Sequence, residues 1–453
     1  MSTFASTFRH GVHPAEHKDL TEHLPIQRMP FVERYVLPLS QHIGAPCRAV
    51  VAAGDTVVRG QVIAEPGGFV SPTLHSPVSG KVVAVAPRRH PNGSMVPSIE
   101  IAADPYSTQQ LGPRETVDWK KLSGKEFVSE VQKSGLVGMG GAAFPSHVKY
   151  ATPEGKKIRR LVINGVECEP FLTCDHRVML ERPEDVVRGT QIVAEKLGVE
   201  SATIGIELNK PDAIEILSKT VREAKVDRME VRGLRVKYPQ GAEKMLIRAL
   251  FRQQVPAGGL PLDLDIVVNN VGTMAGIFNY FERGQPLIER PMTVSGPGVR
   301  KPANLMVPIG TPVREVLRFC GGLTPDTKMV VMGGPMMGSA LADLDGPVLK
   351  GTSGLLAFTE NETGLGKEYP CIRCGRCLEA CANFLNPSRL GQLGRLVKAR
   401  SGRLEILDAL EKNFVYDCME CAACSFACPS NLPLVQLIRT AKAALRDRKK
   451  ATS

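Results

Sequence analysis

The spacing of apolar residues changes several times along the 453-residue chain. In roughly the first 110 residues Val, Ile and Ala alternate with polar residues, and turn pairs such as Gly54-Asp55 and Ser79-Gly80 separate the runs. Alternation with a period of two, broken by turn residues, predicts short strands joined as β-hairpins. We therefore expect an N-terminal β domain over residues 1–115.

The central part of the chain, residues 116–284, shows helical and strand spacing in turn. Helices are predicted for EFVSEVQKSGLVG, PEDVVRGTQIVAEKLG, PDAIEILSKTVREAK and GAEKMLIRALFRQ. Strands are predicted for RRLVING, SATIGIE, GLRVKYP and LDIVVNNV. Strands that alternate with helices indicate a mostly parallel sheet covered by helices. Such a sheet binds its ligand at the carboxyl ends of its strands.

Two smaller units complete the predicted multidomain α+β fold. Residues 285–345 have the pattern of a β-grasp-like unit with one helix in PVREVLRFC, and a Gly-rich linker is predicted around 346–367. Residues 360–453 are predicted to be helical and contain two cysteine runs. The longest uncharged apolar stretch, from Ile266 to Phe281, contains three Asn and is predicted as a strand plus a turn. It is shorter than the roughly 18 apolar residues that suggest a membrane helix.

The composition is that of a globular protein, with 43% hydrophobic and 23% charged residues and a net charge of +11. Nucleic-acid binding is not expected, because the chain has one Trp and seven Tyr and no basic run that interleaves with aromatics. The N-terminus lacks the layout of a secretory signal. We therefore expect a reducing, cytoplasmic compartment, where clustered cysteines are more often metal ligands than disulfides. The basic end RTAKAALRDRKKATS predicts a solvated helix, with a membrane surface or an acidic partner as the alternative.

The two cysteine runs share the spacing C-x2-C-x2-C-x3-C. Three cysteines at two-residue gaps can bind one cubane, and the fourth, expected at the start of a helix, reaches the other cluster. Zinc is the alternative, but its sites favour two separated pairs of ligands. The spacing thus predicts two [4Fe–4S] clusters with crossed ligands: Cys371, Cys374, Cys377 and Cys428 for cluster 1, and Cys418, Cys421, Cys424 and Cys381 for cluster 2.

The other four cysteines share no ligand spacing. Cys47 and Cys320 are expected to be small buried apolar residues. Cys168 and Cys174 are set apart by their neighbours. For Cys168 a small space-filling role is favoured, with an influence on a nearby cofactor as the alternative. Ala382 follows Cys381 at the position where such cysteine runs usually have Pro. This Pro shapes the start of the next helix and is not a ligand, so the substitution leaves the predicted ligation unchanged.

A candidate flavin site explains how the clusters would obtain electrons from a two-electron donor. The Gly-rich loop GLVGMGGAAFPSHVKY precedes a predicted helix, and glycines let a backbone bind phosphate closely. The stretches NGVECEP and VVNNVGT each follow a predicted strand, so both are expected where a parallel sheet binds its ligand. The side-chain amides of Asn164, Asn269 and Asn270 could contact a ribityl chain and a ring edge, although each Asn alone is also typical of a turn.

These motifs resemble known families. GMGGAAFPSHVK, NGVECEP, YPQGAEK and VNNVGT are similar to the loops of the NADH-binding flavoprotein subunit of respiratory complex I. The stretch up to HSPVSGKV resembles the barrel-sandwich hybrid fold of biotinyl and lipoyl carriers, but Lys81 lacks the setting of a carrier lysine. From FRHGVHPAEHK through PLSQHIGAP to the cysteine runs, the whole chain resembles the C subunit of the Rnf electron transport complex. The β-grasp-like unit would then be an SLBB domain.

The resemblance implies a role for each matching residue. A nicotinamide nucleotide would face Glu169, and Phe144 and Tyr238 would lie near the ring systems. The sequence departs from the complex I pattern at Met139, Val166, Ala242 and Lys244, which puts the details of the NADH contact in doubt. The residues implied to hold the FMN phosphate and ribityl chain are Gly138, Gly140, Gly141 and Lys149, and those implied to contact the flavin are Asn164, Glu167, Asn269, Asn270 and Thr273. No further catalytic residue is implied.

The implied function is electron transfer between NAD(H), FMN and the two clusters, in a complex that couples ferredoxin:NAD oxidoreduction to ion translocation. The implied partners are the other subunits, including a ferredoxin-like iron–sulfur subunit. The chain would be a peripheral protein on the cytoplasmic face of the bacterial inner membrane. Two alternatives stay open: a cobalamin reductase of bacterial microcompartments, and an electron-wire subunit whose flavin site is vestigial.

Overall fold

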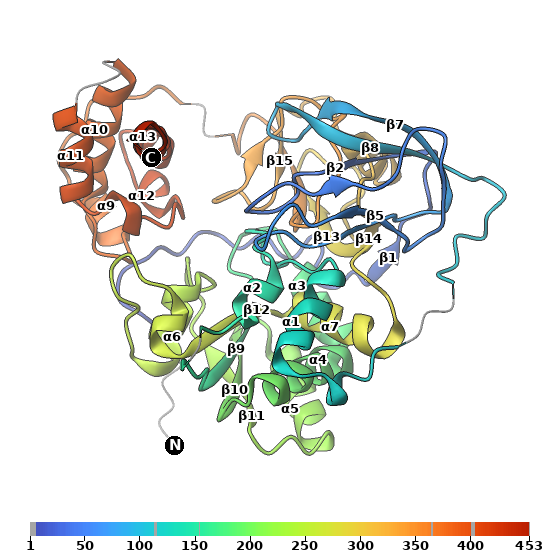
Figure 1. Cartoon of the computed structure of the whole chain (residues 1–453). Coiled ribbons are helices and arrows are strands. Elements are labelled where there is room, and N and C mark those ends of the chain that lie inside the picture. Colours follow the sequence, from blue (N-terminus) through green and yellow to red (C-terminus); the bar gives the residue numbers. More distant parts are fainter. Residues whose placement is uncertain (1–5, 113–115, 154, 364–365, 400–403, 453) are drawn as a thin grey trace.

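The structure is a computed structural model that describes residues 6–112, 116–153, 155–363, 366–399 and 404–452 (Figure 1). The N-terminal β domain and a second sheet lie on one side of a central sheet covered by helices. A helical part lies above α6 (Glu243–Phe251), to the left of these sheets in Figure 1. Within the described ranges, no helix combines the length and the apolar composition that crossing a bilayer requires.

The central sheet has the order β11-β10-β9-β12, and all neighbouring strands are parallel, which confirms the prediction. Its buried strands pack against helices, among them α4, which begins at Pro and is followed by Gly198 in the left-handed conformation. The strands are β9 (Arg160–Gly165), β10 (Ser201–Glu207), β11 (Met229–Leu234) and β12 (Ile266–Asn270). The helices besides α6 are α1 (Gly124–Lys133), α2 (Ser146–Tyr150), α3 (Cys174–Glu181), α4 (Pro183–Leu197), α5 (Pro211–Glu223) and α7 (Val271–Arg283).

Two predictions for the central part are wrong. The stretch from Ile266 to Phe281 is a strand that leads directly into helix α7, not a strand plus a turn. The side chain of Asn270 caps this helix by accepting a hydrogen bond from Gly272 N–H. The predicted strand GLRVKYP starts too late, because β11 ends at Leu234 and Tyr238 instead pairs with Val12 of the N-terminal segment.

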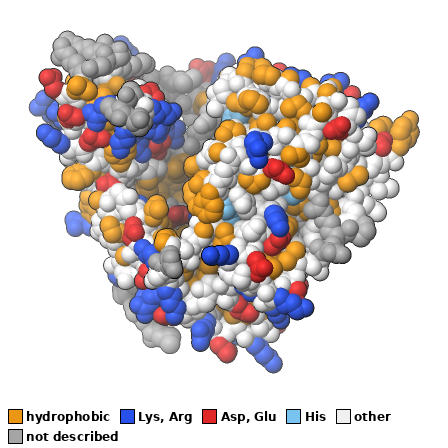
Figure 2. Space-filling view, viewed as in Figure 1, with side chains coloured by type: hydrophobic (Ala, Val, Ile, Leu, Met, Phe, Trp, Pro, Cys, Tyr) orange, Lys and Arg blue, Asp and Glu red, His pale blue; other side chains and the backbone are white. Residues whose placement is uncertain are grey.

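The N-terminal β domain contains two antiparallel sheets, of order β2-β8-β7-β4 and β3-β5-β6. The hairpin predicted at Ser79-Gly80 is wrong, because β6 and β7 belong to different sheets and the chain reverses between β7 and β8, where His90 N–H donates to Ser94 O. Figure 2 shows many apolar side chains over this part of the surface. The strands are β2 (Arg34–Pro38), β3 (Arg48–Ala49), β4 (Thr56–Val57), β5 (Val62–Glu65), β6 (Leu74–His75), β7 (Gly80–Arg89) and β8 (Met95–Ala103).

A mixed sheet of order β1-β14-β13-β17-β15-β16 contains the predicted β-grasp-like unit with helix α8 (Val313–Phe319). Its β17 (Gly354–Phe358) is fully buried between β13 and β15, so the linker predicted around 346–367 is wrong for these residues. Its β1 (Ile26–Arg28) comes from the N-terminal segment. The other strands are β13 (Glu289–Ser295), β14 (Ala303–Pro308), β15 (Met329–Met332) and β16 (Ser339–Ala340).

The C-terminal part is helical, as predicted, and has its own apolar core. Helix α13 packs against α10, and its Arg448 pairs with Asp408 and Glu411, so this basic residue binds acidic groups of the chain itself. The helices are α9 (Arg376–Ala380), α10 (Pro387–Ala399), α11 (Leu404–Lys412), α12 (Ala423–Phe426) and α13 (Leu434–Thr452). Short 3₁₀ turns are η1 (Trp119–Lys121), η2 (Pro261–Leu264) and η3 (Val415–Asp417).

Helices α4 and α7 approach most closely at Gly189, where an added Cβ would lie 1.9 Å from the carbonyl oxygen of Met274. We expect Gly189→Ala to push the helices apart and to lower the stability of the central domain by roughly 1–3 kcal/mol or more. Calorimetry would measure this as a lower unfolding temperature. Gly124→Ala is the control, because no atom lies within 4 Å of the added Cβ at the start of α1. An equal fall in the unfolding temperature of both variants would contradict the packing argument.

Candidate functional site

The Gly-rich loop meets the end of β12 and the first turn of α7 at the carboxyl edge of the central sheet. Met139 N–H donates to Thr273 Oγ1 at 3.0 Å, and Gly140 lies against the side chain of Asn270. Gly141 has a φ of 107°, which favours glycine, and is exposed. The structure thus brings these predicted residues together. Gly138 differs, because its N–H donates to Phe144 O and closes the loop instead of facing a ligand.

A half-buried carboxylate that the sequence prediction missed lies next to this loop. Asp175 Oδ2 accepts a hydrogen bond from Asn270 Nδ2 at 2.6 Å. The predicted residue Glu167 binds the backbone N–H of Asp175 at 2.7 Å and that of His176 at 3.2 Å, at the start of α3. Burial and the negative charge of Glu167 raise the pKa of Asp175. The only sequence signal for Asp175 is its place at a helix start soon after NGVECEP.

Two predicted residues fix the surrounding loops. Lys149 Nζ donates to Val268 O at 2.7 Å and pairs with Glu243 at 2.6 Å. Asn164 Nδ2 donates to Gly241 O at 2.7 Å. Both side chains therefore hold the edge of the site in shape through backbone carbonyls.

Unpaired buried polar atoms lie at the same edge, at the end of β12 before α7 and on the loop after β11. Asn269 Nδ2 and both amide atoms of Gln240 have no hydrogen-bond partner among the described residues, and the two residues are 3% and 0% exposed. A buried amide without a partner costs about 1–3 kcal/mol. A ligand with carbonyl, ring nitrogen and hydroxyl groups, such as a flavin with its ribityl chain, would supply these partners. The residues therefore fit FMN.

A buried lysine of the N-terminal segment holds the loop after β9. Lys18 Nζ donates to the carbonyls of Glu167 at 2.9 Å, Glu169 at 3.1 Å and Leu172 at 2.6 Å, and Lys18 is 5% exposed. Lys210 Nζ donates to Val166 O in the same loop at 2.8 Å. Sequence reasoning assigned neither lysine a role, although Lys18 ends the motif FRHGVHPAEHK.

Glu169, predicted to face the nicotinamide nucleotide, binds a loop of the mixed sheet. Its carboxylate accepts hydrogen bonds from the N–H groups of Met336 and Met337, both at 2.9 Å. Burial raises its pKa to about 7. These bonds connect the central domain to the segment between β15 and β16. A nucleotide contact of Glu169 stays a prediction.

Tyr238 lies between the central sheet and the helical part. It is 1% exposed, and its hydroxyl donates to the backbone carbonyl of Cys421 at 2.7 Å. Cys168 packs beside it and accepts the N–H of Gly241 at 3.2 Å. Burial raises the pKa of the Cys168 thiol, which keeps the thiol neutral and fits the favoured space-filling role. Cys47 and Cys320 are buried, as predicted.

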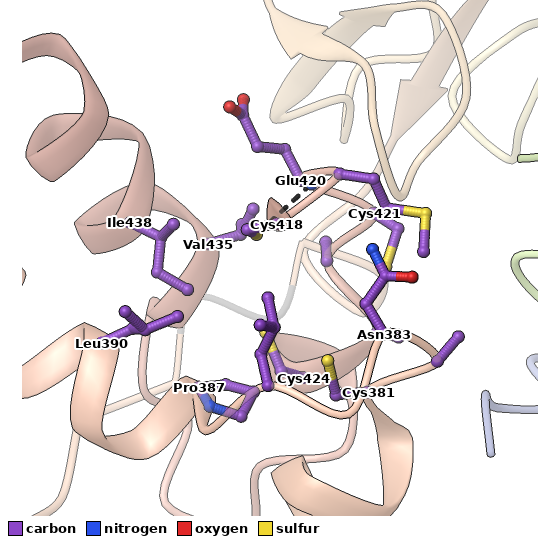
Figure 3. Close-up of a pocket in the computed structure, with 15 residues that line it drawn as sticks. Cys381, Asn383, Pro387, Leu390, Cys418, Glu420, Cys421, Cys424, Val435 and Ile438 are labelled. Atoms are coloured by element: carbon purple, nitrogen blue, oxygen red, sulfur yellow. Dashed lines mark hydrogen bonds between the residues drawn. The ribbon is translucent and has the colours of Figure 1, made fainter. Parts of the chain in front are cut away.

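Cysteines of the two runs lie close together, and the crossed ligand sets stay a prediction. Figure 3 shows one pocket lined by cysteines of both runs, with Leu390, Val435 and Ile438 in its wall. Burial raises the pKa of the Cys377 thiol most, and the nearby thiols of Cys428 and Cys371 raise it further. An apolar pocket lined by sulfurs of both runs fits a cluster. The pocket cysteines are Cys381, Cys418, Cys421 and Cys424. Cys374 is exposed.

The expectation that each fourth cysteine begins a helix is wrong. Cys381 is the C-cap of α9, and Cys428 follows the end of α12. Ala382, in the usual position of Pro, is 1% exposed and packs with Phe8 and Met245. The small side chain therefore makes room for the N-terminal segment.

Family comparisons match four consecutive parts of the chain. The RnfC barrel sandwich hybrid domain matches residues 6–106, and the Nuo51 FMN-binding domain matches residues 131–279. The SLBB domain matches residues 291–340, and the 4Fe-4S dicluster domain matches residues 369–432. These matches confirm the predicted fold class and the cofactors FMN and [4Fe–4S].

Relatives of known name cover most of the chain. The C subunit of the proton-translocating ferredoxin:NAD(+) oxidoreductase complex of Clostridium ljungdahlii is 47% identical over 86% of this chain and 84% of its own. The C subunit of the Na(+)-translocating ferredoxin:NAD(+) oxidoreductase complex of Acetobacterium woodii is 40% identical over 98% of both chains. The C subunit of the ion-translocating oxidoreductase complex of Rhodobacter capsulatus is 41% identical over 98% of this chain and 84% of its own.

The crossed ligand sets predict which substitutions act together. Cys381→Ser and Cys424→Ser should alter the same EPR signal of the reduced protein, whereas Cys377→Ser should alter the other signal, because Cys381 lines the pocket of the second run. Iron content measured alongside would show that the unaffected cluster is retained. If Cys381→Ser and Cys377→Ser altered the same signal, the ligands would not cross.

Glu169 predicts a pH dependence of stability. Its pKa is raised from 4.5 to about 7 in the folded protein, so the folded state binds the extra proton between these values. Stability should therefore fall as the pH rises through this window and level off above it. Glu169→Gln should flatten the fall in unfolding temperature between about pH 5 and pH 7. The exposed Glu215→Gln is the control and should retain the wild-type profile; a wild-type profile in Glu169→Gln would refute the assignment.

Proposed function

The chain belongs to the family of the C subunits of the ion-translocating ferredoxin:NAD oxidoreductase (Rnf) complexes, and we propose that it passes electrons between NAD(H), FMN and two [4Fe–4S] clusters. It is an oxidoreductase subunit of an electron transport complex. Coupling to ion translocation belongs to the complex as a whole. The proposal extends to the direct use of NAD(H) by this chain.

The contact of Tyr238 with Cys421 is the observation that carries the proposal. Tyr238 follows the central sheet, and its hydroxyl reaches the backbone of a predicted ligand of cluster 2 at 2.7 Å. Tyr238, Ala380 and Ala423 form one buried apolar group, so the loop after β11 packs directly against α9 and α12. Cluster 2 therefore lies on the side of the flavin site. In cluster 1, Cys374 is exposed, so this cluster faces outward.

The chain's own residues would bind FMN at the carboxyl edge of the sheet. The exposed loop at Gly140 and Gly141 provides a close approach for a phosphate, and Asn269 Nδ2 and the amide of Gln240 provide buried polar contacts. Bound FMN would supply the exchange between the two-electron chemistry of NAD(H) and the one-electron chemistry of the clusters. Buried Tyr238 excludes water from the region between the site and cluster 2.

The surface around cluster 1 suits an acidic one-electron partner, and we assign it to the ferredoxin-like subunit of the complex. Tyr369 and Ile372 are 54% and 68% exposed, and Arg373 and Arg376 are exposed beside them. An apolar centre with a basic rim is typical of a transient protein contact steered by charge. Figure 2 shows Lys and Arg side chains gathered on the helical part. The proposed location is the cytoplasmic face of the bacterial inner membrane, beside the membrane subunits.

The proposal is tested with Asn269→Ala in protein purified without oxygen. We expect flavin content to fall several-fold, because a buried contact is lost, while iron content stays at the wild-type level. Flavin fluorescence measures the flavin content, and iron analysis measures the iron content. Asn92→Ala, in the distant turn between β7 and β8, is the control. An equal loss of flavin and iron in Asn269→Ala would mean that the flavin lies elsewhere.

NADH titration of the wild-type protein separates the proposal from its alternatives. NADH should reduce the clusters, seen as loss of their visible absorbance. A protein without FMN whose clusters stay oxidised would be an electron-wire subunit. Rapid reduction of cobalamin without membrane subunits would instead favour a cobalamin reductase.

A further inference from the structure

Two side chains donate hydrogen bonds to the backbone carbonyls of predicted cluster 2 ligands. Lys442 Nζ donates to Cys418 O at 2.6 Å, and the hydroxyl of Tyr238 donates to Cys421 O at 2.7 Å. The donors come from different elements, Lys442 from α13 and Tyr238 from the loop after β11. Both donors are largely shielded from bulk water: the side chain of Lys442 is 12% exposed, and Tyr238 is 1% exposed.

The charges next to cluster 2 do not cancel. Lys442 pairs with Glu420 at 2.8 Å, and Arg439 pairs with the same carboxylate at 3.0 Å. Two cations thus share one anion, and the carboxylate of Asp417, next to Cys418, lies 3.9 Å from Lys244 Nζ. These five groups together carry one net positive charge beside the cysteine loop. The N–H of Glu420 also donates to Cys418 Sγ at 3.4 Å, so the backbone that carries this carboxylate touches a ligand sulfur.

Cluster 1 has a different environment. Cys371 Sγ lies 3.6 Å from Ser388 Oγ, and Cys374 is exposed to solvent. The basic neighbours of this cluster, Arg373 and Arg376, are themselves exposed, so water and salt screen their charges. Among the hydrogen bonds of the described residues, none joins a lysine or arginine to a carbonyl of the cluster 1 ligands. Two clusters with the same cysteine spacing therefore lie in distinct electrostatic surroundings.

We propose that Lys442 and Tyr238 set the reduction potential of cluster 2 and raise it above the value that its cysteines alone would give. Reduction adds one electron to the cluster, and a nearby cation and hydrogen-bond donors stabilise the added negative charge. The effect of Lys442 is larger, because it carries a full charge with little screening by water. Both are positioning residues that act through the ligand backbone. The inference rests on the cluster assignment of the proposed function.

Lys442→Met tests the proposal by redox titration with dithionite and mediators, followed by EPR. The potential of one cluster should shift to a lower value, while that of the other stays unchanged. Lys442→Arg, which retains the charge, should stay close to wild type. Arg446→Met is the matched control, because it removes an exposed positive charge one turn further along α13 and should leave both potentials unchanged.

Tyr238→Phe is the second variant, and it decides the question if Lys442→Met loses its cluster. It removes one oxygen atom and should lower the potential of the same cluster by a smaller step. Unchanged potentials in both variants, with wild-type iron content, would overturn the inference. Equal shifts in Lys442→Met and Arg446→Met would also overturn it, because the effect would then be general surface charge.

The titration distinguishes failure of this inference from failure of the proposed function. Dithionite reduces the clusters without NADH or FMN, so the potentials are measured whether or not the flavin site works. Failure of NADH to reduce wild-type clusters would affect the proposed function alone. Unchanged potentials in an NADH-active protein would affect the inference alone.

Discussion

The loop after β9 depends on buried ammonium groups. Three backbone carbonyls of this loop converge on Lys18, whose three N–H donors match them, and Lys210 satisfies a fourth carbonyl. Buried carbonyls without donors would cost more free energy than a marginally stable domain can lose. Because the loop is held in this way, Glu167 reaches the start of α3 and Glu169 reaches the loop of the mixed sheet.

The N-terminal segment joins the domains that the electron path crosses. Val12 pairs with Tyr238, Phe8 packs against Met245 and Ala382, and His10 Nδ1 lies 3.1 Å from Leu378 O between two cysteines. Figure 1 shows this segment passing beneath the helical part. The stretch FRHGVHPAEHK, which served above only to identify the family, therefore holds the cluster domain against the central sheet. That position determines which cluster lies nearer the flavin site.

Regular elements with a clear period are predictable from the sequence, and the errors lie where side chains decide the local structure. Helix α4 has Pro at its start and Gly after its end, so local sequence marks both ends. The pattern at Ile266 predicts the strand but not the helix after it, because the side chain of Asn270 caps that helix and Asn is equally common in turns. The buried strand at Gly354–Phe358 has the local pattern of a linker, because its pairing partner β13 lies far away in sequence.

The sequence by itself determined the parallel central sheet, because the alternation of strand and helix spacing is a local pattern. It also predicted the flavin loops and the cluster cysteines from short motifs. Only the tertiary structure decided the roles of Lys18, Tyr238 and Lys442. Lys18 lies 149 residues from Glu167, and Tyr238 lies 183 residues from Cys421, so neither contact has a local pattern. Lys442 lies in a basic stretch that the sequence predicts to be a solvated helix. In the structure this helix, α13, packs beside the cysteine loop. Burial gives a charge its effect on a neighbouring cluster, and burial is decided by the fold.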